Sequence, residues 1–447
     1  KNEYKIFIFL TFMEMIPISL LSTFSKIFEK VLKKQLMMYL EENNLISKSQ
    51  YGFRQNLSTA DAIDDVINTI TKSLDKGNKS LAIFIDLQKA FDTIDHKILF
   101  KKLKKIGMSN TTLNLLISYM SERSQCVKIE MRKSKPLPIN YGVPQGSVLG
   151  RLLFLIYINN ICNLHTKGKI ISFADDTVIL FNESDWLTTF KDAEHGLILL
   201  QKWLKQNSLT LNVNKTKYLT FSITARGQPA EDYDLKLHDC QGKNLTQSCH
   251  CPTITHSKNI KYLGIEIDEN LRWDFHINSI TTKLTKLVYY FRNIRNILNK
   301  NDLYKVYYAL CQSRLEYGII GWGTASNIHM KQLAKTQKAI IKTIIKVPIK
   351  TPSKEIFKNF NVFSIIKLYS KNALLKFKEK YEYPMDQHTY TTRLKSSKLL
   401  NIPHVNTSFG QKNHIFHATK LYNALPIETK NTMKIQKFKK DIKSWLN

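Results

Sequence analysis

The 447-residue sequence contains only six cysteines, and their spacing is irregular. A chain of this size with so few cysteines does not have the dense disulfide framework of a small secreted domain, so we expect a reducing compartment. The tightest group comprises Cys240, Cys249, His250 and Cys251. Structural zinc sites usually separate paired ligands by two to four residues, and side chains adjacent in sequence diverge too sharply for one tetrahedron. We therefore interpret these residues as ordinary loop residues.

Long apolar runs are also missing. The apolar stretch from Ile6 to Met13 is interrupted by Glu14 and Pro17, well short of the ~20 residues that a membrane span needs. No small-residue cleavage site follows it, so it does not resemble a signal peptide. We expect no membrane partner. Since the sequence begins at Lys1 rather than at methionine, we expect a fragment whose upstream part is missing.

Acidic residues are scarce relative to basic ones. The chain has 36 Asp and Glu against 67 Lys and Arg, a formal charge of +31. This excess predicts a polyanionic partner, with nucleic acid the leading candidate; the alternative is an AT-rich genome that favours lysine codons. With 43% apolar residues, the chain can bury substantial cores, which excludes disorder. Its length predicts two to four domains rather than one small binding module.

The hydrophobic pattern alternates between helical and strand periodicity in the first half of the chain. The continuous apolar run at residues 81–85 is typical of a strand buried on both faces. Two further strands, at residues 170–173 and 177–181, are joined by a tight turn. These features predict an α+β fold. Pattern is lost over residues 224–257, where we expect a linker, and helical patterns dominate from there to residue 349. Helices are expected at residues 19–40, 59–74, 96–106, 147–161 and 186–206, and strands at 125–131 and 217–221.

Three aspartates occupy positions that suggest chemistry. Asp86 follows the buried strand, and Asp175 and Asp176 lie in the hairpin turn. Carboxylates at the ends of buried strands are unfavourable unless a cation compensates them, and oxygen-only ligation suits Mg²⁺. Two such ions about 4 Å apart can activate a primer 3′-hydroxyl and stabilise departing pyrophosphate, which is nucleotidyl transfer. Taken alone, an Asp-Asp pair is more often a turn or a solvated surface.

The residues around these aspartates form three ordered motifs: FIDLQKAFDTIDH at 84–96, YGVPQGSVLG at 141–150 and FADDT at 173–177. They resemble the first aspartate motif, the Pro-Gln-Gly motif and the F/Y-A-D-D box of reverse transcriptases. The resemblance is closest to the jockey-like group of non-LTR retrotransposons, and it spans residue 17 to the C-terminus. Further matches are PISLLS at 17–22, KIFEK at 26–30, QYGFR at 50–54, NSLTLN at 207–212, NKTK at 214–217, YLG at 262–264, LEYG at 315–318, GWG at 321–323 and LYNALP at 421–426.

This resemblance implies a right-hand polymerase fold with fingers, a palm built on an antiparallel sheet and a helical thumb, followed by a mostly helical C-terminal region. We expect fingers and palm over residues 1–268, thumb over 269–347 and a basic C-terminal region over 348–447. The implied activity is RNA-directed DNA synthesis for retrotransposition. Its partners would be an RNA template, a DNA primer, dNTPs and two Mg²⁺ ions, with Mn²⁺ as a possible substitute.

The resemblance also assigns roles to individual residues. Asp86, Asp175 and Asp176 would be the catalytic metal ligands. Lys215 would neutralise or protonate departing pyrophosphate; Lys217 is the second choice, and an ordinary solvated lysine is the alternative. The residues implied to contact the incoming dNTP are Arg54, Leu87, Phe91, Gln145 and Gly146.

The dNTP contacts have distinct chemical reasons and structural alternatives. A guanidinium at Arg54 suits a triphosphate, but could equally form a salt bridge. Phe91 would lie under the sugar and clash with a 2′-hydroxyl, or else be a core aromatic. Gln145 and Gly146 would lie against the nascent base pair, where glycine permits close approach of the backbone. They could otherwise form a simple turn.

Two parts of the pattern depart from the family. Lys1 to Met15 lacks the expected basic fingers strands, and Ile16 stands where an arginine usually precedes Pro-Ile. Arg151 replaces a proline, and Asn160 stands where aspartate is common. These differences favour an alternative reading as a catalytically decayed nucleic-acid-binding remnant. A group II intron maturase would share the palm motifs, although the C-terminal matches count against it.

Two expectations concern partners and surfaces. No endonuclease motif is present, so that activity is expected from an upstream domain or another protein. An active element of this kind would work in the nucleus and cytoplasm. A lysine stripe could track a template backbone or form a solvated helix face; it comprises Lys331, Lys335, Lys338, Lys342 and Lys346.

Overall fold

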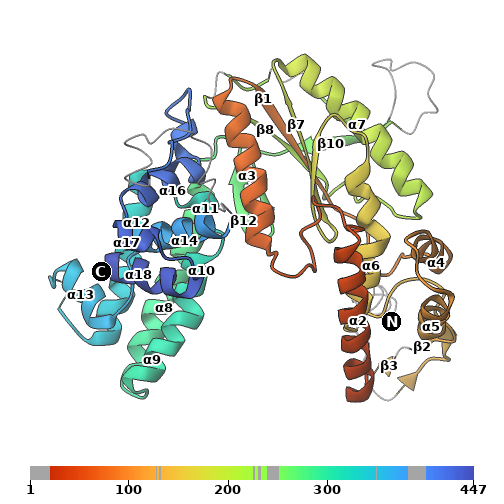
Figure 1. Cartoon of the computed structure of the whole chain (residues 1–447), viewed down its shortest axis with the longest axis horizontal. Helices are drawn as coiled ribbons and strands as arrows, with labels where there is room; N and C mark the ends of the chain where they lie inside the picture. Colours follow the sequence, from red (N-terminus) through yellow and green to blue (C-terminus); the bar gives the residue numbers. More distant parts are fainter. Residues whose placement is uncertain are drawn as a thin grey trace, which may run out of the picture.

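The computed structural model describes residues 21–126, 128–129, 132–224, 227–229, 233–238, 251–348, 350–380 and 399–446. The chain forms an arch (Figure 1): a sheet and its covering helices lie at the top, and two groups of helices descend on either side. We call α2, α4 and α5 the N-terminal limb and the helices from α8 to α18 the C-terminal limb. None of the helices in the described ranges is long and apolar enough to cross a membrane.

A six-stranded sheet forms the centre of the molecule, in the order β6-β7-β1-β8-β10-β9. Neighbouring strands are antiparallel except β8 and β10, which pair in parallel. The expected palm sheet is therefore present but mixed rather than purely antiparallel. Its strands are β6 (Lys169–Phe173), β7 (Asp176–Glu183), β1 (Lys79–Ile85), β8 (Lys217–Phe221), β10 (Thr253–His256) and β9 (Leu235–Lys236).

Strand β1 shows why the sheet is central. Leu81, Ile83 and Ile85 point into one core, whereas Ala82 and Phe84 point into another, as the two-residue period of a strand requires. The first core includes α6 (Gly150–Ile158) and α7 (Trp186–Gln206), and the second includes α3 (Thr59–Asp75). The prediction of a strand buried on both faces is confirmed.

The N-terminal limb contains α2 (Thr23–Glu42), α4 (His96–Lys105) and α5 (Asn110–Met120). Helix α2 was expected, and only the later part of its apolar face is covered, where Leu36 and Leu40 are buried. Phe24, Ile27 and Phe28 are more than half exposed, and the buried residue among them is Glu29. Helix α5 was not anticipated, and the strand expected near residue 125 is replaced by short hairpins. These pair β2 (Ser124–Gln125) with β5 (Leu137–Pro138) and β3 (Lys128–Ile129) with β4 (Arg132–Lys133).

The C-terminal limb is helical, as expected. A hairpin of β11 (Asn259–Tyr262) and β12 (Ile265–Asp268) leads into it. One apolar core continues from α3 through these helices to α18, so residue 347 does not mark a gap in packing, and the division into domains stays a prediction. The helices are α8 (Asp274–Ile294), α9 (Lys300–Tyr307), the π-helix η3 (Tyr308–Gln312), α10 (Ser313–Glu316), α11 (Ile319–Trp322), α12 (Asn327–Ile345), α13 (Ser353–Phe360), α14 (Ile365–Lys380), the 3₁₀ turn η4 (Gly410–Lys412), α16 (His414–Asn423), α17 (Ile427–Lys430) and α18 (Ile435–Leu446).

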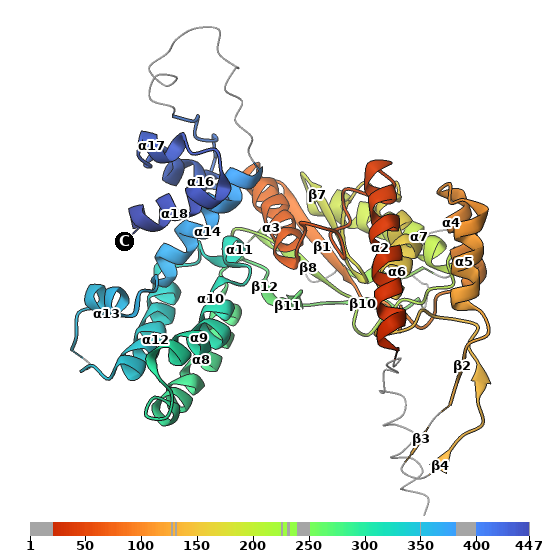
Figure 2. The same ribbon diagram turned by 60° about the horizontal axis from the view of Figure 1, so that its bottom comes forward.

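Acidic residues of α3 hold the C-terminal limb in place. Figure 2 shows α3 between that limb and the sheet. Asp61 pairs with Lys376, and the buried Asp64 pairs with Lys380 at 3.3 Å. At the end of α3, the Asp75 carboxylate accepts hydrogen bonds from the backbone N–H groups of residues 406 and 407. Buried ion pairs of this kind fix geometry more than they add stability.

The linker expected over residues 224–257 is partly wrong, because β9 and β10 extend the sheet there. Ile254 and Leu235 are buried, but two- and four-residue strands are too short to show periodicity. Cys240, Cys249 and His250 of the expected loop group lie outside the described residues.

Candidate active site

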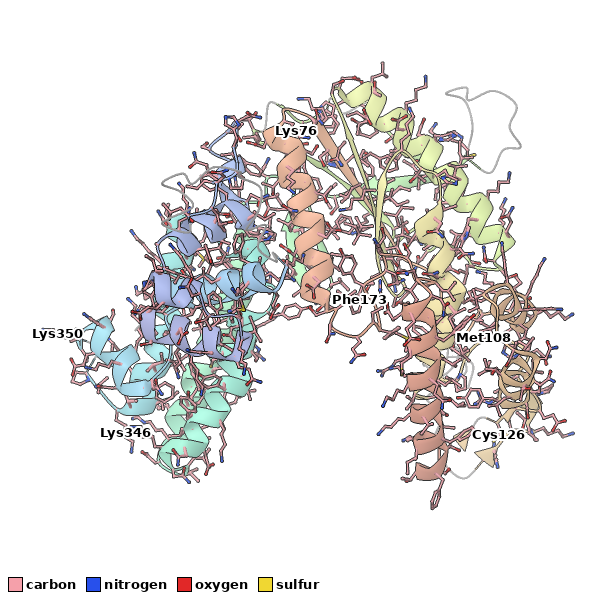
Figure 3. All side chains as sticks on the ribbon, viewed as in Figure 1. Lys76, Met108, Cys126, Phe173, Lys346 and Lys350 are labelled. Carbon is pink, nitrogen blue, oxygen red and sulfur yellow. The ribbon has the colours of Figure 1, made fainter. Side chains whose placement is uncertain are left out.

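Asp175 lies in the turn between β6 and β7, and Asp176 is the first residue of β7. Figure 3 places Phe173, the last residue of β6, at the inner side of the arch. Strand β1 runs antiparallel to β7, and its last residue Ile85 pairs with Thr177. Asp86, the residue after β1, therefore comes next, at the position opposite Asp176, the first residue of β7. Residues that face each other in an antiparallel pair have Cα atoms about 5 Å apart, so the fold brings the three predicted carboxylates together.

The buried side chain of Gln50 braces this turn. Its Nε2 donates to Ser172 Oγ at 3.1 Å, and its Oε1 accepts from the N–H groups of Gly52 at 2.8 Å and Ala174 at 3.0 Å. Ala174 has φ 58°, a left-handed conformation that is unusual for a residue with a side chain. Gly52 packs so closely that an added Cβ would lie 2.4 Å from the backbone N of Ala174. The QYGFR motif thus supports the β6–β7 turn through Gln50 and Gly52.

Asp86 is held through its backbone by the loop before β8. Its N–H donates to Thr216 Oγ1 at 3.2 Å, and its carbonyl accepts from Asn212 N–H at 2.8 Å. Lys215 lies exposed in the same turn, where its N–H donates to the Asn212 carbonyl. The backbone of this turn is thus joined to Asp86 through Asn212, and the role of Lys215 stays a prediction.

The carboxylates disfavour one another's ionisation. Partial burial raises the pKa of Asp175 above its ordinary value, and the Asp86 charge adds to the effect. Partial burial, followed by the charges of Asp175 and Asp86, raises the pKa of Asp176 to about 6. Desolvation and a like charge act in the same direction on an acid. This repulsion is what a bound cation would relieve.

The donor chemistry fits a hard divalent cation, since all three side chains offer only carboxylate oxygens. Within the described part of the chain, however, no three acidic, histidine or cysteine side chains converge closely enough to hold a metal ion as they stand. The backbone thus positions the three aspartates, while ion binding would still require their side chains to turn toward a common point.

The raised pKa of Asp176 makes a prediction about stability. Because the folded state raises this pKa above the unfolded value of 3.8, ionisation of Asp176 destabilises the fold as pH rises from about 4 through about 6. Without divalent ions, Asp176→Asn should therefore raise the melting temperature at pH 7 and change it little at pH 4. Thermal unfolding followed by circular dichroism checks this, and an equal shift at both pH values would contradict the account.

The Pro-Gln-Gly segment lies against the loop that follows Asp86. Gln145 Nε2 donates to Asp92 Oδ1 at 2.7 Å, and Val143 N–H donates to the Phe91 carbonyl at 2.9 Å. Gly142 has φ 80°, and an added Cβ would meet the Asp92 backbone at 2.9 Å. Gly146, at φ 92°, is exposed. The structure therefore joins this segment to Phe91 through Val143 and to Asp92 through Gln145.

Phe91 belongs to a small aromatic group. Its ring stacks on Phe154 with centroids 4.1 Å apart, and Phe53 approaches it edge-on at 6.5 Å. Arg151, the residue that departs from the family pattern, lies 5.8 Å from the Phe53 ring centroid. Phe91 is only partly buried, so it is held firmly from one side and keeps accessible surface.

Two predicted dNTP contacts are otherwise engaged. Arg54 forms a two-point ion pair with Glu41, at 2.9 and 2.6 Å, and also donates to the Ser47 and Gln50 carbonyls. The salt-bridge alternative describes this arrangement, and contact with a triphosphate would require the pair to open. The Leu87 side chain is buried and its backbone bridges to Leu211, so only its backbone could approach a nucleotide.

The expected primer-grip and thumb motifs meet. The Tyr317 hydroxyl donates to the Leu263 carbonyl at 2.5 Å and accepts from the Thr59 hydroxyl at 3.0 Å. Gly264 turns beneath the same ring, with φ 83°. Tyr262 is buried near the turn, and burial raises its pKa, with a smaller contribution from Asp176. This hydrogen bonding fixes the β11–β12 turn against the C-terminal limb.

The predicted lysine stripe lies on α12. Lys331, Lys335 and Lys346 are exposed, and the opposite face with Leu333 and Ile340 is buried. Figure 3 shows Lys346 near the lower end of the C-terminal limb. Lys338 and Lys342 are half-buried, so the stripe is only partly solvated, and template tracking stays a prediction.

Sequence reasoning missed the role of Glu29. This residue is 1% exposed, and its carboxylate accepts from the N–H groups of Val148 and Leu149 at the start of α6 and from the Tyr119 hydroxyl. An acid at a helix N-terminus satisfies otherwise unpaired N–H groups. The only sequence signal was a lone acid among lysines, which normally indicates a solvated face.

The family model described as "Reverse transcriptase (RNA-dependent DNA polymerase)" matches residues 14–267. The chain is 27% identical over 360 residues to the RNA-directed DNA polymerase from mobile element jockey of Drosophila melanogaster, covering 77% of this chain and 37% of that protein. It is 26% identical over 370 residues to the probable RNA-directed DNA polymerase from transposon BS of the same species, covering 80% and 39%. The resemblance to jockey-like elements is confirmed.

The chain spans a little over a third of the length of these relatives. Among solved structures, telomerase from Candida tropicalis in complex with a telomeric RNA fragment aligns with a TM-score of 0.40 at 12% identity, over 95% of this chain and 56% of that one.

Proposed function

The chain belongs to the reverse transcriptase (RNA-dependent DNA polymerase) family, and on that premise we propose that it extends a primer 3′-hydroxyl with dNTPs on an RNA template. The observation that carries the proposal is the meeting of Asp86 with Asp175 and Asp176 at the inner side of the arch. These residues come from two paired strands, and their charges already influence one another.

Each part of the site has a role in this proposal. Reverse transcriptases normally use divalent metals, and Mg²⁺ bound by the three aspartates would lower the barrier to phosphoryl displacement by activating the hydroxyl and neutralising pyrophosphate. Asp86, Asp175 and Asp176 hold the charge that recruits the ions. Lys215, on the exposed turn beside Asp86, meets the pyrophosphate as it leaves.

Phe91 sets the choice of sugar. Phe154 backs its ring, which cannot retreat from an incoming nucleotide without disturbing a stacked pair 4.1 Å apart. The 2′-hydroxyl of a ribose placed over this ring would clash with it, whereas a 2′-deoxyribose would not. Gln145 is fixed by Asp92 and presents, with Gly146, the surface against which the nascent base pair lies.

The partners in this proposal are an RNA template, a DNA primer and dNTPs, and the biological outcome is retrotransposition. The printed names of the jockey and BS relatives describe RNA-directed DNA polymerases of mobile elements. A nick that exposes the primer end would come from an endonuclease supplied by an upstream domain or another protein.

Primer extension tests the proposal. With Mg²⁺ and oligo(dT) on poly(rA), the chain should incorporate dTTP and discriminate strongly against UTP. Replacing Phe91 with alanine should raise UTP incorporation relative to dTTP by at least about tenfold, because the steric clash is removed. Leu187→Ala, at an exposed position in the first turn of α7, serves as a truncation control.

The outcomes separate the two readings of the chain. Extension with dTTP supports a live polymerase. Failure to extend, with tight binding of the primer–template retained, supports a catalytically decayed remnant that keeps its affinity for nucleic acid.

A further inference from the structure

A cavity of about 450 Å³ lies in the C-terminal limb, outside the site described above. It is formed where η3, the segment before α14 and helix α18 meet. Figures 1 and 2 both show α18 beside α14 in this limb. A volume in this range is typical of pockets that accept small organic ligands. The lining includes Tyr308, Gln312, Lys371, Lys439, Lys440 and Lys443.

Gln312 gives the cavity an unused acceptor. Its side chain is 3% exposed, and its Nε2 donates to Glu316 Oε1 at 3.2 Å. Because a carboxylate only accepts, this contact fixes the orientation of the amide and leaves Oε1 as the other atom. Within the described residues, Oε1 has no hydrogen-bond partner. A buried unpaired acceptor is unfavourable, and a turn of the Gln312 amide toward the cavity would let a ligand N–H satisfy it.

The walls of the cavity suit a flat ring. Tyr308 and Gln312 lie at the two ends of the π-helix η3, and π-helical turns often occur at functional sites. The Tyr308 side chain is 39% exposed, although its hydroxyl accepts from Tyr304 at 3.0 Å. Val362 and Phe363 supply buried apolar surface to the same lining. An aromatic face with apolar neighbours is a stacking platform.

The charge of the lining suits a polyanion. Its described residues include four lysines and no acid. Glu316 pairs with Lys371 at 2.8 Å, which leaves the charges of Lys439, Lys440 and Lys443 on one side of α18. These three side chains are exposed. The lysines at the rim could pair with the phosphates of a nucleic acid, and the hydrogen-bond acceptor inside the cavity could pair with one of its bases.

We propose that this cavity binds one unpaired base of a single-stranded nucleic acid, whose flanking phosphates lie on the lysines of α18. The base stacks on Tyr308 and donates an N–H to Gln312 Oε1. An acidic peptide would satisfy the lysines but would leave the acceptor and the aromatic face unused, so nucleic acid is the better match. The proposal goes beyond the polymerase function and does not depend on catalysis.

Equilibrium binding to the full chain tests the proposal. The chain is first saturated with an unlabelled primer–template, and a fluorescein-labelled ten-nucleotide single strand, RNA in one arm and DNA in the other, is then titrated by fluorescence anisotropy. Tyr308→Ala should weaken binding roughly fivefold or more, the typical loss for one stacked base, and Tyr308→Phe should not. A strand with an abasic site at its centre should bind the unmodified chain as weakly as the intact strand binds Tyr308→Ala.

Two further measurements test the role of the α18 lysines and the position of the bound base. The triple change Lys439→Gln, Lys440→Gln, Lys443→Gln should weaken binding and flatten its salt dependence. The triple Lys101→Gln, Lys104→Gln, Lys105→Gln removes the same charge from exposed positions on α4 and should not. A strand containing 5-iodouridine should crosslink to the peptide that contains Tyr308 when irradiated.

Three results would overturn the proposal. The first is that the abasic and intact strands bind equally well. The second is that the two lysine triples weaken strand binding equally. The third is that a polyglutamate peptide displaces the labelled strand as well as the unlabelled strand does. All readouts are binding or crosslinking, so they stand whether or not the chain extends a primer. RNA and DNA arms that differ would identify which strand the cavity prefers.

Discussion

The double variant Asp175→Ala, Asp176→Ala is expected to lose primer extension by at least about 1,000-fold. Removing both carboxylates from the β6–β7 turn leaves Asp86 alone to hold a divalent cation, and electrostatic contributions of this size are typical where charge is stabilised in the transition state. The measurement is the rate of single-nucleotide addition on oligo(dT)-primed poly(rA) with Mg²⁺.

The fold of this variant should survive, which makes the result interpretable. The two side chains repel each other and Asp86 in the unmodified chain, so their removal relieves strain in the metal-free state. Affinity for the primer–template should therefore change little. A variant that still extends at a tenth of the normal rate would contradict the assignment of these aspartates.

The second large effect is expected from Gly52, which lies behind the same turn. An alanine Cβ at this position would lie 2.4 Å from the backbone N of Ala174 and 3.0 Å from the Phe173 carbonyl carbon. Neither atom belongs to a flexible side chain, so Gly52→Ala must displace the turn that carries Asp175. A displacement of about 1 Å can cost roughly 100-fold in rate, and we expect a loss of extension of that order.

Gly321→Ala is the matched control for this change. It adds the same methyl group at a glycine in α11, where the nearest atoms are Ile63 Cγ2 at 3.5 Å and Ile67 Cγ1 at 3.6 Å, an ordinary van der Waals distance. Extension by this variant should match the unmodified chain. If both glycine variants lost activity equally, the effect would be general destabilisation rather than displacement of the turn.

Gln50→Leu tests the same brace by a different route. Leucine keeps the apolar volume but leaves the N–H groups of Gly52 and Ala174 without their acceptor. Each unpaired buried donor costs about 1–3 kcal/mol, so both stability and extension should fall. A chain with unchanged melting temperature and unchanged extension would show that the glutamine does not position the aspartates.

The sequence predicted the centre of this site because its signals are local. Asp86 follows five consecutive apolar residues, and Asp175 and Asp176 separate two strands with clear patterns. Pairing of those strands is enough to bring the three residues together. The motifs on either side gave the family, which the match over residues 14–267 supports.

What sequence reasoning missed depends on contacts between distant segments. Gln50 and Ala174 are 124 residues apart, and Glu29 reaches Leu149 across 120 residues. Neither the hydrophobic pattern around these residues nor their sequence neighbours indicate which distant residue they contact. The exposed apolar residues near the start of α2 are a related case, since a sequence pattern identifies an apolar face but not whether anything in the described chain covers it.

The triphosphate role that the family resemblance implies for Arg54 stays a prediction. The motif that contains it is present, yet its guanidinium is held by Glu41 and two carbonyl oxygens. Glu41 lies in α2, and sequence alone offered no reason to pair it with Arg54. The cavity beside α18 is a similar case, because Gln312 and Lys440 belong to segments with no motif in common.

The central claim is that Asp86, Asp175 and Asp176 together hold divalent cations. It is tested most directly by counting bound Mn²⁺ by electron paramagnetic resonance at pH 7.5, with a dideoxy-terminated primer–template and the matching dNTP present. The account predicts two tightly bound ions in the unmodified chain and a loss of tight binding in the Asp175→Ala, Asp176→Ala variant. Equal Mn²⁺ binding by the two proteins would contradict it.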